Sequence, residues 1–236
     1  MKLVRAVLFD WDGTLVDSME VKIRNAGNLF QLVFHLPSGQ VEEAYRLHSG
    51  VPRRELFDAI LKQLGHPALE EEAYRSLSNS FSDMNRASLR DPDLPGLVPP
   101  ATYQVLENLL QAGCRLFVSS SADSLEVRDI AEAHGLADYF TRSGGEMLGS
   151  YPGFSKGSQH VKFVLNKFML SLNEMIFVGD DPADIQLGRS AGVYTVARVG
   201  TLTADKLSTY APDAIVNSLD ELTSLPGLKF GGPERA

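Results

Sequence analysis

Two acidic residues follow the first apolar segment of the chain. Residues Leu3 to Phe9 form a nearly continuous apolar run of strand length, and Asp10 and Asp12 come directly after it. Because side chains alternate along a strand, residues two apart face the same side. Gly13 permits the tight turn that must follow. Two carboxylates held together repel each other, so this pair calls for a cation or a shared proton.

A second acidic group follows another strand-like run. Met175 to Val178 lead into a segment that contains Asp180, Asp181 and Asp184. Open α/β sheets place their ligands at the carboxyl ends of the strands, so we expect the two acidic groups to meet there. Carboxylate oxygens in this number suit Mg²⁺, which takes one or two carboxylates together with a substrate phosphate.

Hydroxyl groups and a lysine between these acids could hold a phosphate. The apolar run that starts at Arg115 ends in Ser119 and Ser120, whose hydroxyls and amides can donate to phosphate oxygens. Lys156 stands at the start of a helical pattern, where a positive charge opposes the helix dipole. Binding an anion would explain that position.

Strand-like and helical patterns alternate along most of the chain. The strand-like runs cover residues 3–9, 115–119, 175–178, 193–197 and 214–216, with a weaker candidate at 139–141. Helical patterns cover residues 106–110, 125–133, 161–168 and 185–191, and several end at glycine, the usual helix stop. This alternation predicts an α/β fold with a Rossmann-like, doubly wound parallel sheet.

One long segment interrupts the alternation. From Asp17 to about Arg90 the apolar residues recur at helical spacing, and a proline-rich stretch follows. Roughly 75 residues are far more than an ordinary connection between a strand and a helix requires. We therefore predict an inserted all-helical cap domain over residues 17–92, with Asp17 as the N-cap of its first helix. Residues 1–16 and 93–236 form the α/β catalytic core.

Composition narrows the class of protein. The 236 residues are 44% hydrophobic and 22% charged, with a net charge of −8, which disfavours a nucleic-acid partner. The apolar runs are too short to cross a bilayer, so we expect no membrane association and a cytoplasmic location. The single cysteine, Cys114, cannot form an internal disulfide.

The motifs together resemble those of the haloacid dehalogenase superfamily. The residues that carry the resemblance, in chain order, are Asp10-Trp11-Asp12-Gly13-Thr14, then Ser119, then Lys156, then Gly179-Asp180-Asp181 with Asp184. The helical insertion after the first motif resembles the subfamily I cap of phosphoglycolate phosphatases and β-phosphoglucomutases. Relatives often have Lys-Pro at the third motif, where Lys156 is followed by glycine, so Lys162 is a weaker alternative. They commonly have Ser or Thr at the position of Asp181, so Asp180 is the expected direct ligand and either Asp181 or Asp184 supplies the additional acid.

The resemblance implies a reaction and a role for each motif. Asp10 would attack phosphorus to form an aspartyl-phosphate, and Asp12 would serve as general acid and then general base. Mg²⁺ would be bound by Asp10, the backbone carbonyl of Asp12 and Asp180, while Ser119 and Lys156 hold the phosphate. Thr14 would orient Asp12 or its loop.

The function expected from this resemblance is a Mg²⁺-dependent phosphatase for a small phosphorylated metabolite, with a phosphoglycolate-like monoester as the first candidate. The chain would act as a monomer or homodimer. A phosphosugar mutase or a pyrophosphatase would share the same core residues. A non-enzymatic phosphoacceptor switch is disfavoured, because receivers of that kind carry their acceptor after the third strand and lack a long helical insertion. Asp12 argues against dehalogenase chemistry, which has no use for a second acid.

Substrate choice would depend on residues outside these motifs. Arg53 and Arg54 follow a short loop in the cap, and an arginine there would suit a second anionic group on the substrate. Trp11 lies between the two acids of the first motif and either packs in the core or forms a wall of the substrate cavity. The five histidines show no metal-ligand spacing and are interpreted as surface or packing residues.

Overall fold

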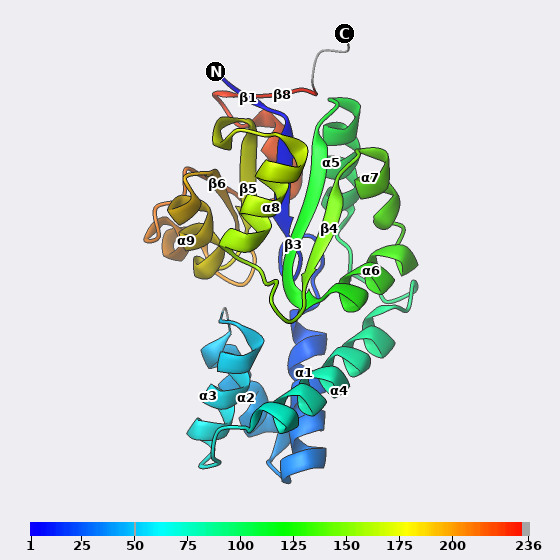
Figure 1. Cartoon of the computed structure of the whole chain (residues 1–236), viewed down its shortest axis with the longest axis vertical. Helices are drawn as coiled ribbons and strands as arrows, with labels where there is room; N and C mark the ends of the chain where they lie inside the picture. The colour runs from blue at the N-terminus through cyan, green and yellow to red at the C-terminus, as the bar shows by residue number, and fades with distance from the viewer. Residues whose placement is uncertain (50, 233–236) are drawn as a thin grey trace. The chain divides into compact units, whose positions relative to one another are not determined.

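The computed structural model describes residues 1–49 and 51–232. Internal contacts divide it into two compact units (Figure 1). The core unit comprises Met1–Asp17 and the described residues from Pro92 onward, and the helical unit comprises Ser18–Asp91.

A parallel sheet forms the centre of the core unit. Its six strands lie in the order β4, β3, β2, β5, β6, β7, and all neighbouring pairs are parallel. Their bounds are β2 (Ala6–Asp10), β3 (Arg115–Asp123), β4 (Glu146–Ser150), β5 (Met175–Gly179), β6 (Tyr194–Arg198) and β7 (Ala214–Val216). This arrangement confirms the predicted α/β fold with a doubly wound parallel sheet.

The strand order creates a switch point beside β2. The chain proceeds from β2 outward to β3 and β4, and then returns to the other side of β2 to form β5, β6 and β7. Ligands of open α/β sheets bind at the carboxyl ends of the strands where the order reverses. The ends of β2 and β5 are therefore the expected place for a site.

Helices cover both faces of this sheet. α8 (Ser158–Phe168) and α9 (Pro182–Ala191) pack against the face that carries Leu8, Phe117 and Phe177. α5 (Pro100–Gln111) and α6 (Ser124–Ala133) contact β3. The remaining elements of the core unit are β1 (Lys2–Val4), α7 (Ala137–Arg142), η1 (Leu172–Glu174), α10 (Ala204–Ser208), η2 (Leu219–Ser224) and β8 (Leu228–Phe230).

Two sequence predictions about strands were wrong. Residues 139–141 lie in the helix α7, because Leu136 and Phe140, four residues apart, are both buried on one side of this turn. The first apolar run is not one strand: β1 pairs with β8 in a separate two-stranded sheet, and β2 starts after Arg5. The edge strand β4 was missed because Glu146 to Ser150 show neither an apolar run nor a clear alternation.

The helical unit contains four helices around an aromatic core. They are α1 (Met19–Phe34), α2 (Ser38–His48), α3 (Arg53–Gln63) and α4 (Glu71–Leu89). The ring of Phe57 contacts those of Phe30 and Phe81 edge-on, with centroids 5.2 and 5.4 Å apart. Ser18, not Asp17, directly precedes α1. Asp17 instead forms an ion pair with Arg198 at the end of β6, at 3.2 Å, so its predicted N-cap role was wrong.

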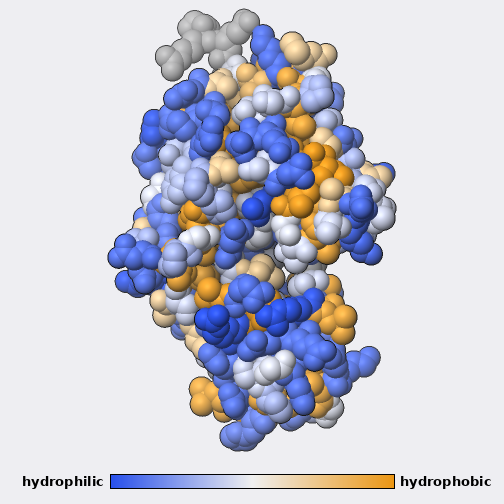
Figure 2. All heavy atoms as spheres, turned by 180° about the vertical axis from the view of Figure 1, so that it is seen from behind, coloured by the Kyte–Doolittle hydropathy of each residue, from blue (hydrophilic) through white to orange (hydrophobic). Residues whose placement is uncertain are grey.

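Hydrophilic side chains cover most of the face shown in Figure 2, with smaller hydrophobic areas between them. Among the described residues, no helix combines the length and the apolar character that crossing a membrane requires.

Candidate active site

Strand β2 delivers Asp10 to the switch point. Asp10 is the last residue of β2, pairs in register with Ser119 on β3, and is 4% exposed. The chain then turns sharply through Gly13, whose φ is 82°. A Cβ at Gly13 would lie 2.4 Å from a carboxylate oxygen of Asp180, so only glycine fits this close approach.

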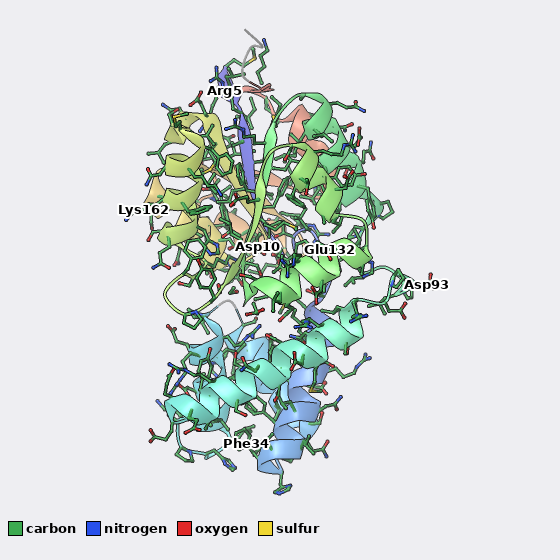
Figure 3. All side chains as sticks on the ribbon, turned by 45° about the vertical axis from the view of Figure 1, so that its right-hand side comes forward. Arg5, Asp10, Phe34, Asp93, Glu132 and Lys162 are labelled. Carbon is green, nitrogen blue, oxygen red and sulfur yellow. The ribbon has the colours of Figure 1, made fainter. Side chains whose placement is uncertain are left out.

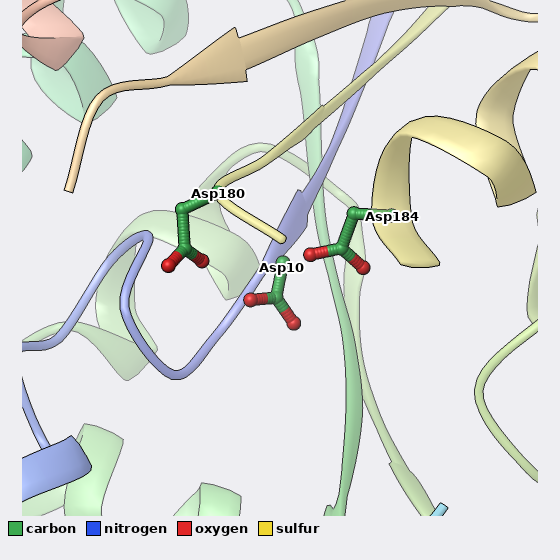
Figure 4. Close-up of side chains that lie close together, drawn as sticks. All are labelled: Asp10, Asp180 and Asp184. Carbon is green, nitrogen blue, oxygen red and sulfur yellow. The ribbon is translucent and has the colours of Figure 1, made fainter. Parts of the chain in front are cut away.

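Three buried carboxylates converge at this point (Figure 4). Asp10 ends β2, Asp180 directly follows β5, and Asp184 lies in the first turn of α9. Each offers an oxygen within 4.8 Å of the others. Of the two acids left open by the sequence, Asp184 therefore joins the cluster. Asp181 instead caps α9, because its side chain accepts a hydrogen bond from the amide of Ala183 at 2.8 Å.

Lys156 joins two of these carboxylates. Its Nζ lies 2.6 Å from Oδ1 of Asp10 and 2.6 Å from Oδ1 of Asp184. Lys156 stands in the loop just before α8. Lys162, the alternative candidate, is exposed on α8 and points away from Asp10 (Figure 3). The structure thus brings Lys156, and not Lys162, into the cluster.

Burial and mutual repulsion shape the charges of the cluster. Burial, reinforced by the Asp184 carboxylate and opposed by Lys156, raises the pKa of Asp10 to about 7. Burial and the Asp10 carboxylate raise the pKa of Asp180 to about 7. Burial opposes the charge of Lys156 as well, but the Asp10 and Asp184 carboxylates outweigh it and raise the pKa of Lys156. The lysine is therefore charged. Three ionised carboxylates would carry more negative charge than this one lysine offsets, and burial together with this excess is why their pKa values are raised.

Thr14 binds the carboxylates themselves. Its buried hydroxyl lies 2.9 Å from Oδ1 of Asp180 and 3.3 Å from Oδ2 of Asp10. Thr201 adds a hydroxyl 3.4 Å from Oδ2 of Asp180. The hydroxyl of Thr14 thus connects Asp10 with Asp180, whereas the sequence led us to expect that it orients Asp12 or the loop.

Asp12 is half-buried two residues beyond the end of β2. It forms an isolated parallel bridge with Val16, and its charge is close enough to contribute to the raised pKa of Asp10. Trp11 between them is fully buried, which agrees with core packing better than with a cavity wall.

Ser119 has a partner that the sequence analysis missed. Its fully buried hydroxyl lies 2.9 Å from Nδ1 of His160 on α8. His160 is also fully buried, and burial, followed by the charge of Lys156, lowers its pKa to about 4, against the effect of the Gly149 carbonyl. Its position four residues after Lys156, at the start of the same helix, was the available signal.

The second serine has a local role. Oγ of Ser120 accepts a hydrogen bond from the amide of Ala122 at 3.0 Å, and its carbonyl accepts one from Ser150. These bonds shape the end of β3. The substrate contact expected of Ser120 from the sequence stays a prediction.

The two cap arginines bind partners within the helical unit. Arg53 is the first residue of α3 and donates to both Ser78 and Ser82 on α4, the latter at 2.7 Å. Arg54 pairs with Asp58 at 2.7 Å and with Glu71 at 3.2 Å. Both guanidinium groups thus connect α3 with α4, and the substrate-reading role expected from the sequence stays a prediction.

The carboxylate cluster fits a divalent metal ion. Asp10, Asp180 and Asp184 supply hard oxygen ligands of the type that Mg²⁺ prefers. Their buried negative charge exceeds the single charge of Lys156, so a cation would compensate the remainder.

Comparison with known proteins identifies one family for this chain and relatives that are similar to it over most of their length. Residues 4–192 match the model of the haloacid dehalogenase-like hydrolases. A phosphoglycolate phosphatase from Vibrio vulnificus is 27% identical over 224 residues, covering 93% of this chain and 94% of its own. A pyrophosphatase from Bacillus velezensis is 25% identical, covering 97% of this chain and 99% of its own.

Solved structures share the fold. A β-phosphoglucomutase from Clostridium difficile superimposes with a TM-score of 0.73 and covers 93% of each chain, at 15% sequence identity.

Proposed function

Because the chain belongs to the haloacid dehalogenase-like hydrolase family, we propose that it is a Mg²⁺-dependent phosphatase of small phosphorylated metabolites that works through an aspartyl-phosphate at Asp10. The observation that supports this most is the buried cluster of Asp10, Asp180, Asp184 and Lys156 at the switch point of the sheet. A phosphoglycolate-like monoester is the first candidate substrate, in keeping with the relative from Vibrio vulnificus.

Asp10 has the position and the neighbours of a nucleophile. Lys156 contacts one of its oxygens and the Thr14 hydroxyl lies near the other, so the carboxylate has a fixed orientation. In the first step an oxygen of Asp10 bonds to phosphorus while the bond to the leaving oxygen breaks. Asp12 gives its proton to that leaving oxygen.

The second step restores the enzyme. Asp12 takes a proton from a water molecule whose oxygen bonds to phosphorus, and the bond between Asp10 and phosphorus breaks. Inorganic phosphate leaves, Asp10 is again a carboxylate, and Asp12 is again protonated. Throughout, Ser119 and Lys156 would donate to the phosphate oxygens.

Asp10, Asp180 and the backbone carbonyl of Asp12 would hold the Mg²⁺. Asp184, the third acid of the cluster, would add negative charge beside the metal ion and hold Lys156 in place. When bound, the metal ion would offset the negative charge that otherwise keeps a carboxylate from an anionic phosphate.

The test is a substrate panel with the purified full-length chain. Phosphoglycolate, hexose phosphates, nucleotides and pyrophosphate are each assayed for phosphate release with Mg²⁺ and with EDTA, and Asp10→Asn serves as the control. We expect Mg²⁺-dependent release from at least one monoester and none from Asp10→Asn, whose amide cannot attack phosphorus. Near-normal turnover by Asp10→Asn would overturn the proposal, and a strong preference for pyrophosphate would replace the monoester as substrate class.

A further inference from the structure

The hydrogen bond between Ser119 and His160 connects the proposed phosphate site to the helix behind it. Ser119 pairs in register with Asp10, so its hydroxyl lies beside the proposed nucleophile. Both Ser119 and His160 are fully buried, and Oγ and Nδ1 are 2.9 Å apart. A serine hydroxyl has one hydrogen, so whether it donates to the imidazole or accepts from it decides where that hydrogen points.

The imidazole is held firmly and is uncharged. Its ring contacts that of Phe154, with centroids 4.5 Å apart. The positive charge of Lys156 lies close enough to disfavour a second positive charge on the ring. A neutral imidazole carries a hydrogen on one nitrogen only, and the hydrogen bonds around it set which nitrogen that is.

The surroundings of the second nitrogen indicate which one carries the hydrogen. Nε2 is buried and has no hydrogen-bond partner in the described part of the chain, whereas Nδ1 lies 2.9 Å from the Ser119 oxygen. The Gly149 carbonyl also lies near the ring and favours an N–H on it. A buried N–H without an acceptor is costlier and rarer than a buried acceptor without a donor. The hydrogen therefore belongs on Nδ1, which faces the Ser119 hydroxyl.

We propose that His160 is a positioning residue that donates from Nδ1 to the Ser119 oxygen, so that the Ser119 hydroxyl hydrogen points to a phosphate oxygen of the substrate. This inference rests on the proposed function. In this proposal His160 acts through Ser119 and makes no contact with the substrate itself. The opposite tautomer would draw the hydroxyl hydrogen to the ring and leave the phosphate facing an oxygen lone pair.

Two substitutions distinguish the hydrogen bond of His160 to Ser119 from the packing of its ring. His160→Phe keeps the ring and its contact with Phe154 but has no N–H. His160→Asn can place its amide N–H where Nδ1 lies. On the best substrate of the panel we expect kcat/KM to fall about 3- to 15-fold for His160→Phe, the equivalent of one hydrogen bond. His160→Asn should retain most of the activity.

A double-mutant cycle with Ser119→Ala tests whether His160 acts through Ser119. If it does, His160→Phe should lower kcat/KM by less than twofold once Ser119 is alanine. Equal fold losses with and without the serine hydroxyl, or an equal loss in His160→Asn, would overturn the proposal. The thermal midpoint of each variant is measured alongside, so that a loss of folded protein is not counted as a loss of activity.

Nuclear magnetic resonance of the full-length chain gives a readout independent of turnover. The imidazole ¹⁵N signals report which nitrogen is protonated, and the His160→Phe spectrum identifies the signals that belong to His160. We expect the hydrogen on Nδ1 at pH 7. A hydrogen on Nε2 would refute the inference even if the chain is an active phosphatase. A wild-type chain inactive on every phosphate ester would instead count against the proposed function and leave the tautomer result standing.

Discussion

Lys156 supplies Asp10 with a positive charge that no residue next to it in sequence provides. Its ammonium group contacts Asp10 and Asp184 at equal distances, so one lysine joins strand β2 to helix α9. Buried like charges raise the free energy of the folded state unless a cation lies among them. The same charges that prepare the site for a metal ion therefore make its metal-free form less stable.

Two neighbouring aspartates allow a matched test of the metal site. Asp180→Asn removes a buried carboxylate of the cluster, whereas Asp181→Asn removes a charge at the N-cap of α9 and leaves a residue that caps equally well. We expect Mg²⁺ to raise the thermal midpoint of the wild type and of Asp181→Asn, but to have little effect on Asp180→Asn. Equal Mg²⁺ responses of the two variants would contradict the assignment of Asp180.

His160 should leave a signature in the acid stability of the protein. Its pKa is about 4 in the folded chain, against about 6.5 when unfolded. Between these values the unfolded state binds a proton that the folded state does not, so the free energy of unfolding falls as pH drops from 6.5 to 4. The loss is about 3 kcal/mol at most.

Denaturant unfolding of wild type and His160→Phe at several pH values measures this effect. The aspartates of the cluster, whose raised pKa values act in the opposite direction as pH rises, are common to both proteins and cancel in the difference. We expect the stability of His160→Phe relative to wild type to rise as the solution is acidified. A difference that does not change with pH would show that His160 is not the neutral group described above.

At the scale of elements, the sequence predicts the buried strands and the edge strand β7, but it does not predict the edge strand β4. Strands β2, β3 and β5 are buried on both faces and therefore read as continuous apolar runs. β4 lies at the edge of the sheet, so its half-polar sequence carries no such signal. The meeting of the acids after β2 and β5 could be predicted, because the carboxyl ends of parallel strands lie at the same edge of a sheet. His160 could not, because its meeting with Ser119 depends on how α8 packs on the sheet.

The partners of Arg53 and Arg54 also depend on how helices pack, which the sequence does not show. They give a further prediction. A pair of arginines after a loop suits an anion, but α3 and the segment around α4 lie close enough to bind both side chains. We expect Arg53→Ala to lower the free energy of unfolding by about 1–2 kcal/mol, since its hydrogen bonds to α4 are lost. Activity on para-nitrophenyl phosphate should change by less than about twofold. The loss of a substrate contact worth about 1.4 kcal/mol would lower it about tenfold.

Arg75→Ala is the matched control. Arg75 pairs with Glu71 on the surface of the same unit, and such exposed pairs contribute less than about 1 kcal/mol. If Arg53→Ala is no less stable than Arg75→Ala, or selectively loses activity on anionic substrates, Arg53 is a substrate contact and not a tie between helices.

At the scale of the whole molecule, the residues of the proposed reaction lie in one unit, and the other unit has a hydrophobic core of its own. Asp10, Ser119, Lys156 and Asp180 all belong to the core unit. The helical unit has its own hydrophobic core, centred on Phe57. We propose, as the sequence led us to expect, that the helical unit is a cap that selects the leaving group while the core unit performs the reaction.

Hydrogen exchange can test the independence of the two units. Phe57→Leu in the helical unit and Phe117→Leu in the core unit each shrink a fully buried ring, at a cost of about 1–2 kcal/mol. We expect each substitution to speed amide exchange chiefly within its own unit. Uniform acceleration over both units after either change would show a single cooperative unit.

The central claim is that Asp10 carries the phosphoryl group during turnover. Borohydride reduces an acyl phosphate but not a free carboxylate, so adding it during turnover converts a phosphorylated aspartate to homoserine. Trypsin then releases the peptide Ala6 to Lys22, in which the position of the homoserine is read. With the best substrate and Mg²⁺, we predict homoserine at position 10 and unchanged aspartate at position 12. Homoserine at position 12, or turnover with no trapped residue in this peptide, would contradict the account.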